Sequence, residues 1–376
     1  MPNFFSNLFK NLFKKNEESV LGIDIGASSI KIVQLRKKGG KAVLETYGAL
    51  SLGPYAGTEV GRATVLPPEK IITALTDILR EAKTTSKKGG VTIPFGSTLM
   101  SVIEMPGVDE KNLAAMIPIE ARKYIPVPIT EVSLDWSIIP HDNVIKAEGQ
   151  TPTILPDGHK KIETLSILLV AIHNETLQEY QNIVQKVALD ANFFEIEIFS
   201  TIRAVLDKNI APVMILDVGA ASTKTYIVDR GIIRASHTIN RGSQDITMAI
   251  ASTLSIPVDK AEIMKRTIGW SKEPQNIDLA KTIALIADNI FSEAKHVVTN
   301  YQSKYAKSVE KAILVGGGSS MKGFGELAQA GLEMPVELGD PFSKVEAPAF
   351  LSEVLKRNGP EFTASLGIAL RRIMEQ

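Results

Sequence analysis

The chain has no cysteine, only five histidines and no excess of either charge, and each shortage argues against a class of function. Without cysteine there can be no disulfide and no thiolate ligand or nucleophile. The histidines stand singly, without the spacing of a metal-binding pair. Lysine plus arginine and aspartate plus glutamate number 42 each, so no basic surface is indicated for binding nucleic acid.

Length and overall composition are ordinary. At 376 residues the chain exceeds a single ordinary core, which predicts two domains or four subdomains. Apolar residues make up 44% and charged residues 22%, as in a soluble globular protein. Composition therefore leaves the function open, and the informative features are local.

Residues 3–15, NFFSNLFKNLFKK, place their large apolar side chains at the spacing of one helix face. The segment is too short to span a bilayer, and it lacks the continuous apolar core and cleavage site of a secretory signal. Two interpretations stay open. The helix docks on protein, either its own domain or a neighbouring chain, or it lies in the plane of an anionic membrane surface.

The most informative feature is a segment that occurs twice, LGIDIGASSIKIVQL at 21–35 and MILDVGAASTKTYIV at 214–228. Both copies have the pattern of a strand, a small-residue turn and a second strand. At one constant offset they share Asp24/Asp217, Gly26/Gly219, Ala27/Ala220, Ser29/Ser222 and Lys31/Lys224. Agreement at a single offset argues against two ordinary hairpins that are similar by chance.

The residue types in these turns suit a polyphosphate. Glycine lets the backbone approach a ligand, and turn N–H groups and hydroxyls can surround phosphate oxygens. A carboxylate would repel phosphate, so Asp24 and Asp217 fit only with a hydrated Mg²⁺ between them and the phosphates, or with a water to orient. Lys31 is either a point charge for a phosphate or a side chain on the solvent face of its strand.

A third glycine cluster, ILVGGGS at 313–319, ends an apolar strand in three consecutive glycines. Three glycines form a poor strand and a poor helix, and they suit a place where a flat group such as a nucleoside passes the backbone. Two facing hairpins and one glycine turn together predict a nucleotide in a cleft between two duplicated halves. The loop at 51–68 is predicted as an irregular surface loop.

This pattern resembles the actin-like ATPase superfamily, and within it the FtsA-like branch and the PilM family of type IV pilus assembly proteins. The segment 91–139, which includes EARKYIPVPITEVSLDWSII, is similar to the small subdomain that PilM and FtsA carry as an insertion. The stretch GGGSSMKGFGELAQAGLEMPVELGDPFSKV and the closing FTASLGIALRR are also similar to PilM. No C-terminal amphipathic tail like that of FtsA is present.

The resemblance implies an α/β, actin-like ATPase fold, with two duplicated halves around a nucleotide cleft and an FtsA/PilM-type inserted subdomain. Its expected parts are the N-terminal amphipathic segment 1–18, the first actin-like subdomain 19–86 with 162–206, the inserted subdomain 87–161, the second actin-like subdomain 207–242 with 310–376, and a satellite subdomain 243–309. The last helix is expected to pack back across the cleft.

The resemblance also implies site residues for ATP and Mg²⁺. Glu262 and Lys265 are three residues apart on one helical face, where they would approach the ribose and base or form a solvated charge pair. The family often has Gly-Gly where this chain has Gly242-Ser243, which puts phosphate contact there in doubt. The residues assigned to the nucleotide are Gly26, Ser28, Ser29 and Lys31, then Gly219, Ser222, Thr223 and Gly242, then Glu262 and Lys265, and finally Gly316, Gly317, Gly318 and Ser319. Asp24 and Asp217 would hold Mg²⁺ through water, and Asp217 is the catalytic candidate for orienting an attacking water.

The function implied is that of a cytoplasmic, ATP-binding scaffold at the inner face of the cytoplasmic membrane, with slow hydrolysis at most. Its partners would be the N-terminal cytoplasmic peptide of the inner-membrane protein PilN and other platform proteins of the pilus. The peptide would lie in a groove between the first subdomain and the insertion, where Ile119, Tyr124 and Ile125 either line the groove or belong to the core. An FtsA-like filament, which requires self-association into a homo-oligomer, and a small-molecule kinase are the alternatives. No catalytic triad or paired acid is apparent.

Overall fold

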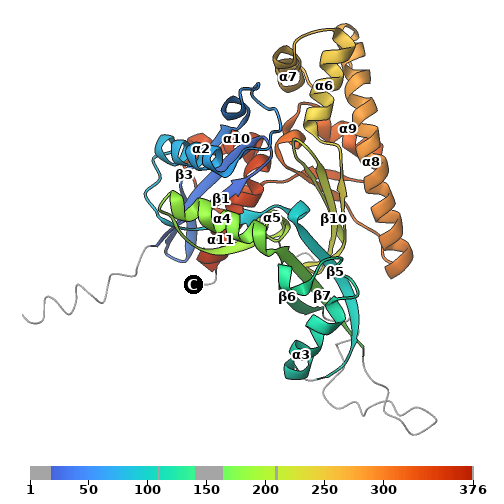
Figure 1. The fold of residues 1–376 in the computed structure, drawn as a ribbon. Coiled ribbons are helices and arrows are strands. Elements are labelled where there is room, and N and C mark those ends of the chain that lie inside the picture. Colours follow the sequence, from blue (N-terminus) through green and yellow to red (C-terminus); the bar gives the residue numbers. More distant parts are fainter. Residues whose placement is uncertain (1–17, 109, 140–163, 208–210, 375–376) are drawn as a thin grey trace, which may run out of the picture. The chain divides into compact units, whose positions relative to one another are not determined.

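The computed structural model describes residues 18–108, 110–139, 164–207 and 211–374, so the helix predicted at 3–15 and the last part (140–161) of the expected insertion lie outside them. The chain forms two compact units, residues 1–93 with 181–376 and residues 94–180. The first unit contains two five-stranded sheets, and the second contains one three-stranded sheet (Figure 1).

The first sheet has the strand order β3-β2-β1-β4-β8. Two antiparallel pairings join β1 to β2 and β2 to β3, whereas β4 runs parallel to β1 and β8 runs parallel to β4. Its strands are β1 (Ser19–Ile25), β2 (Ser29–Lys38), β3 (Lys41–Ser51), β4 (Lys88–Ile93) and β8 (Asp190–Ile196).

The second sheet repeats this arrangement in the order β11-β10-β9-β12-β13, with the same antiparallel and parallel pairings. Its strands are β9 (Val213–Val218), β10 (Thr223–Asp229), β11 (Ile232–Ile239), β12 (Ala312–Val315) and β13 (Val336–Leu338). In both sheets the repeated sequence segment forms the hairpin of the second and third strands, β2 with β1 and β10 with β9. The predicted α/β fold with two duplicated halves is therefore confirmed.

The first sheet packs against α2 (Pro68–Glu81), α5 (Glu197–Val205) and α11 (Thr363–Met374). Although α11 follows the second sheet in sequence, it contacts β1, β2, β4 and α5 rather than ending in the second half. Small residues permit this close packing. A Cβ at Gly22 would lie 1.9 Å from the carbonyl oxygen of Ser365, and one at Gly367 would lie 1.9 Å from that of Ser200. The short helix α10 (Ser352–Asn358) precedes α11.

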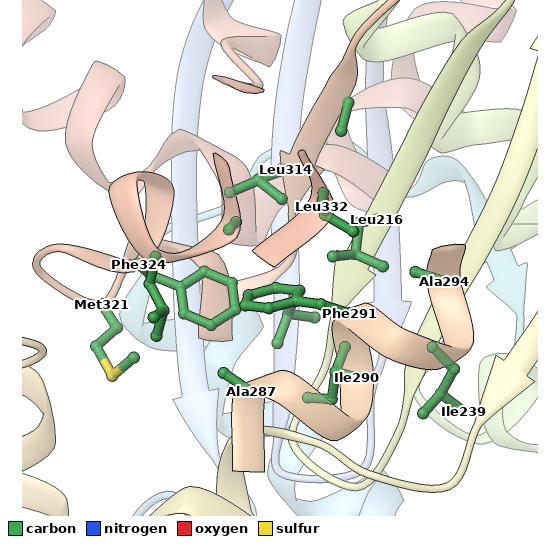
Figure 2. Close-up of a cluster of buried hydrophobic side chains, with 14 of the residues drawn as sticks. Leu216, Ile239, Ala287, Ile290, Phe291, Ala294, Leu314, Met321, Phe324 and Leu332 are labelled. Atoms are coloured by element: carbon green, nitrogen blue, oxygen red, sulfur yellow. The ribbon is translucent and has the colours of Figure 1, made fainter. Parts of the chain in front are cut away.

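Four helices supply most of the hydrophobic core beside the second sheet. They are α6 (Ser243–Leu254), α7 (Val258–Thr267), α8 (Ile277–Tyr305) and α9 (Phe324–Leu332). Buried side chains of α8 recur at helical spacing, and Phe291 meets Phe324 of α9 with ring centroids 5.7 Å apart (Figure 2). Among the described helices, including the long α8, none has an apolar run sufficient to cross a membrane.

The second unit contains the sheet β5-β7-β6, formed by β5 (Thr98–Pro106), β6 (Val132–Ile139) and β7 (Thr164–His173), with α3 (Glu110–Ala121) packed on it. It begins and ends later than the insertion expected at 87–161, because β4 pairs within the first sheet and β7 is the central strand of this one. Helix α4 (Asn174–Lys186) follows β7. The finer division into subdomains stays a prediction.

The sequence left open whether three apolar residues of the second unit belong to its core or to its surface. Their burial in the structure now assigns each of them. Ile125 is 6% exposed and belongs to the core of this unit. Ile119 and Tyr124 are 65% and 45% exposed, so their side chains are not needed to fill the core.

Candidate functional site

The two hairpin turns are built in the same way. In the first, the N–H of Gly26 donates to the carbonyl of Ser29 over 3.0 Å, and in the second, the N–H of Gly219 donates to the carbonyl of Ser222 over 3.0 Å. The strand register also repeats. Asp24 stands opposite Lys31 as Asp217 stands opposite Lys224. The sequence repeat is therefore a repeat of backbone geometry.

Both turns face one cleft of about 470 Å³ within the first unit. The glycine turn and one face of α7 complete its lining, so the structure brings most of the predicted residues together. The predicted residues in this lining are Asp24, Gly26, Ser28, Ser29, Lys31, Asp217, Gly219, Ser222, Glu262, Lys265, Gly316, Gly317 and Gly318.

Three predicted residues do not line the cleft. The hydroxyl of Thr223 is buried and donates to the carbonyl of Arg241 over 2.8 Å. The hydroxyl of Ser319 is likewise buried and donates to the carbonyl of Gly316 over 2.7 Å. Gly242 packs against the second turn, where a Cβ would lie 2.3 Å from the Ala220 carbonyl oxygen. These three stabilise the backbone that forms the site.

The three glycines of the glycine turn differ in what a Cβ atom would meet at each position. Gly316 has φ +82°, and a Cβ there would lie 2.3 Å from Oδ1 of Asp217. A Cβ at Gly318 would lie 2.5 Å from Cγ1 of Val218. A Cβ at Gly317 would meet nothing of the protein closer than Glu361 at 3.8 Å, so packing does not require glycine there. The free face of Gly317 borders the cleft.

A buried ammonium group lies among carboxylates at the second hairpin. Nζ of Lys224 lies 3.0 Å from Oε2 of Glu197, the first residue of α5, and 3.8 Å from Oδ2 of Asp217. Burial opposes the charge on Lys224, but Glu197, Asp217 and Asp24 together raise its pKa above the usual value. Lys224 is therefore a permanent cation at physiological pH.

The carboxylate at the first hairpin is held differently. Oγ1 of Thr92 on β4 donates to Oδ1 of Asp24 over 2.7 Å. Among the described residues no three acidic, histidine or cysteine side chains gather closely enough to chelate a metal ion. Separate carboxylates beside exposed turn N–H groups fit a hydrated Mg²⁺, which keeps several waters and takes few protein ligands.

Glu262 and Lys265 form part of a buried network on α7. Oε2 of Glu262 accepts from Thr247 over 2.6 Å and lies 2.7 Å from Nζ of Lys265, while Oε1 lies 2.6 Å from Nε of Arg266. Burial alone would raise the pKa of Glu262, but the ion pair with Lys265 and the hydrogen bonds lower it. The pair is thus a fixed feature of the cleft wall and not a solvated surface pair.

The loop predicted as surface reaches the opposite wall of the cleft. The N–H of Ala63 donates to Oε1 of Gln244 on α6 over 2.6 Å, and the N–H of Thr64 donates to the carbonyl of Ala27 over 2.9 Å. Gly61, with φ +86°, lies so close that a Cβ would be 3.0 Å from Oε1 of Glu262. Residues 61–64 therefore connect the two halves beside the first turn.

Several lining residues were not predicted as site residues: Glu197, Lys224, Gly61, Arg266 and Glu361. Lys224 had a signal, because the repeat aligns it with Lys31. Glu197 and Glu361 belong to no motif, and only the packing of α5 and of the segment before α11 brings them to the cleft. Burial raises the pKa of Glu361, and the charges of Lys31 and Arg266 oppose that rise.

Comparisons with known proteins agree with this geometry. The profile of the type IV pilus assembly protein PilM family matches residues 22–373. The cell division protein FtsA of Neisseria meningitidis serogroup B is 24% identical over 274 residues, which cover 66% of this chain and 64% of that protein. The match thus spans less than two thirds of the length of that relative.

Solved structures show the same fold at low sequence identity. A PilM–PilN type IV pilus biogenesis complex superposes with a TM-score of 0.76 at 23% identity, covering 94% of this chain and 98% of that one. MreB 5 of Spiroplasma citri bound to AMPPNP gives 0.54 at 12% identity, covering 95% and 97%. The ethanolamine utilization protein EutJ from Carboxydothermus hydrogenoformans gives 0.54 at 15%, covering 97% and 96%. Because the family profile runs from β1 to α11, the chain belongs to the PilM family of type IV pilus assembly proteins and has the actin-like ATPase fold.

Proposed function

We propose that the cleft binds ATP with Mg²⁺ and that the nucleotide sets the geometry of a scaffold in type IV pilus assembly. The observation that carries this proposal is the pair of identically built turns facing one cleft together with the glycine turn. Turn N–H groups and the hydroxyls of Ser28, Ser29 and Ser222 would surround the phosphates, and Lys31 would add a positive charge.

Asp24 and Asp217 would hold Mg²⁺ through its water shell, and the ion would supply positive charge between these carboxylates and the phosphates. The adenosine would pass the free face of Gly317, with Glu262 and Lys265 toward the ribose and base. The fold neighbour MreB 5, which was solved with AMPPNP, supports a nucleotide in this cleft.

Hydrolysis is proposed to be slow. Asp217 is the candidate for orienting the attacking water, but its Oδ2 lies 3.8 Å from Nζ of Lys224, so this carboxylate already faces a fixed partner within the protein. Binding rather than turnover is thus the role that this geometry supports.

The proposed partner is the N-terminal cytoplasmic tail of PilN, which would place the protein at the inner face of the cytoplasmic membrane beside other platform proteins. The PilM–PilN complex among the fold neighbours supports this partner. The exposed Ile119 and Tyr124 are available apolar side chains on the second unit. An extended peptide is recognised through main-chain hydrogen bonds and pockets for alternate side chains.

Titration calorimetry with the tail peptide of the PilN homologue from the same organism, with and without Mg-ATP, tests this function. We expect binding that Ile119→Ser and Tyr124→Ser each weaken. Leu285→Ser on α8, at a residue that is 66% exposed, is the matched control and should bind as the unmodified protein does. ATP-dependent pelleting without peptide binding would instead favour an FtsA-like filament.

A further inference from the structure

The two lysines of the repeat occupy equivalent positions but have different surroundings. Lys31 and Lys224 each stand opposite the aspartate of their own hairpin. The side chain of Lys224 is 17% exposed, and its ammonium group is paired with Glu197 and Asp217. Within the part of the chain that the structure describes, Lys31 forms no ion pair, although its ammonium group borders the cleft.

The charges around Lys224 do not balance. Glu197, Asp217 and Asp24 all line the cleft, and Lys224 is the cation in direct contact with the first two of them. Without Lys224 this carboxylate cluster (Asp24, Glu197 and Asp217) would repel a nucleotide more strongly, because every charge there acts in a partly desolvated site. A cation supplied by the protein and a cation from solution can both reduce this repulsion.

We propose that Lys224 is a fixed counter-cation for the carboxylate cluster, which positions Glu197 and Asp217 and makes nucleotide binding less dependent on Mg²⁺. The inference rests on the proposed binding of ATP. It assigns different tasks to the two lysines. Lys31 meets the phosphates, whereas Lys224 neutralises carboxylates and is held too closely by Glu197 to reach a phosphate as well.

The experiment measures the dissociation constant of ATP by calorimetry, once with Mg²⁺ and once with EDTA. The quantity compared among variants is the dissociation constant in EDTA divided by the dissociation constant with Mg²⁺. For Lys224→Met we expect this ratio to rise by about tenfold over the unmodified protein. Removing the positive charge of Lys224 weakens ATP binding most when no Mg²⁺ is present to replace it. For Lys31→Met the affinity should fall in both conditions, with a change in the ratio of less than about threefold.

Charge rescue separates this role from a purely structural one. The double variant Glu197→Gln with Lys224→Met has the same net charge in the cluster as the unmodified protein. Its ratio should return to within about threefold of that protein, and Glu197→Gln alone should lower the ratio. The double variant removes both members of the Lys224–Glu197 ion pair, so that it provides a test even if Lys224→Met alone folds poorly.

Three results can be told apart. If the unmodified protein binds no ATP in either condition, the proposed function fails. If it binds ATP but the ratio stays the same in Lys224→Met, the counter-cation role is overturned and the function stands. The role is also overturned if the double variant is folded by circular dichroism and keeps a raised ratio.

Discussion

The two hairpins of the repeat share their turn hydrogen bond and their Asp–Lys register, yet their carboxylates are held by different groups. Asp24 accepts a hydrogen bond from the hydroxyl of Thr92. Asp217 faces the ammonium group of Lys224 and lies against the backbone of Gly316. The difference arises from the neighbouring strands and helices, because the hairpins themselves are closely alike.

The parallel strand beside each hairpin is also followed by a different segment of the chain. In the first sheet β4 is followed by Pro94 and the second compact unit, and in the second sheet β12 is followed by the glycine turn. One half thus supplies an insertion, and at the matching position the other supplies the glycine turn that lines the cleft. Identical backbone turns can therefore serve unequal roles in one cleft, and the following variants test this inequality.

The largest effect is expected from the two lysines. Lys224→Met breaks the buried ion pair with Glu197 and should lower the free energy of unfolding by about 3–5 kcal/mol. Lys31→Met, at the equivalent position, should change it by less than about 0.5 kcal/mol. Urea unfolding without nucleotide measures both. Equal shifts of the unfolding midpoint would show that the hairpins are equivalent after all.

A smaller effect is expected at the glycine turn. Gly316→Ala places a Cβ against Asp217 in a backbone region open mainly to glycine, and should cost about 1–3 kcal/mol. Gly317→Ala is the matched control, because its Cβ has room, so its stability should be unchanged while its affinity for ATP falls. Thermal unfolding and calorimetry measure the two quantities. Unchanged ATP affinity in Gly317→Ala would contradict a nucleoside passing this face.

The hydroxyl that holds Asp24 is the next test. Thr92→Val removes a buried donor while keeping the shape of the side chain, and should cost about 1–2 kcal/mol. Thr92→Ser keeps the donor and should retain most of the hydrogen-bond contribution. Chemical denaturation of the three proteins provides the comparison. If valine and serine were equally destabilising, packing and not the hydrogen bond would be the cause.

The smallest effect is expected where residues 61–64 join the halves. Gln244→Ala removes the acceptor for the N–H of Ala63 and should cost about 1 kcal/mol, and it should speed the release of ATP. Gln244→Glu keeps an acceptor oxygen and is the control. Stopped-flow displacement of a fluorescent ATP analogue measures the release rate. An unchanged rate in Gln244→Ala would show that this contact does not retain the nucleotide.

Local pattern was sufficient to predict the repeat, its two turns and the glycine turn, because each depends on residues adjacent in the chain. Local pattern was insufficient for Thr223 and Ser319. Both follow glycine-rich turns like ligand residues, but each hydroxyl is satisfied by a nearby backbone carbonyl. A hydroxyl beside a turn can bond to the protein or to a ligand, and only its orientation in the fold distinguishes the two.

The sequence by itself determined the duplicated α/β halves, the two small-residue turns and the family. Only the tertiary structure decided that Glu197 of α5 pairs with Lys224 and that residues 61–64 cross to Glu262 and Gln244. The physical reason is the same in each case. These contacts join residues far apart in the chain, and their ion pairs and close approaches depend on how whole helices pack and not on any local residue preference.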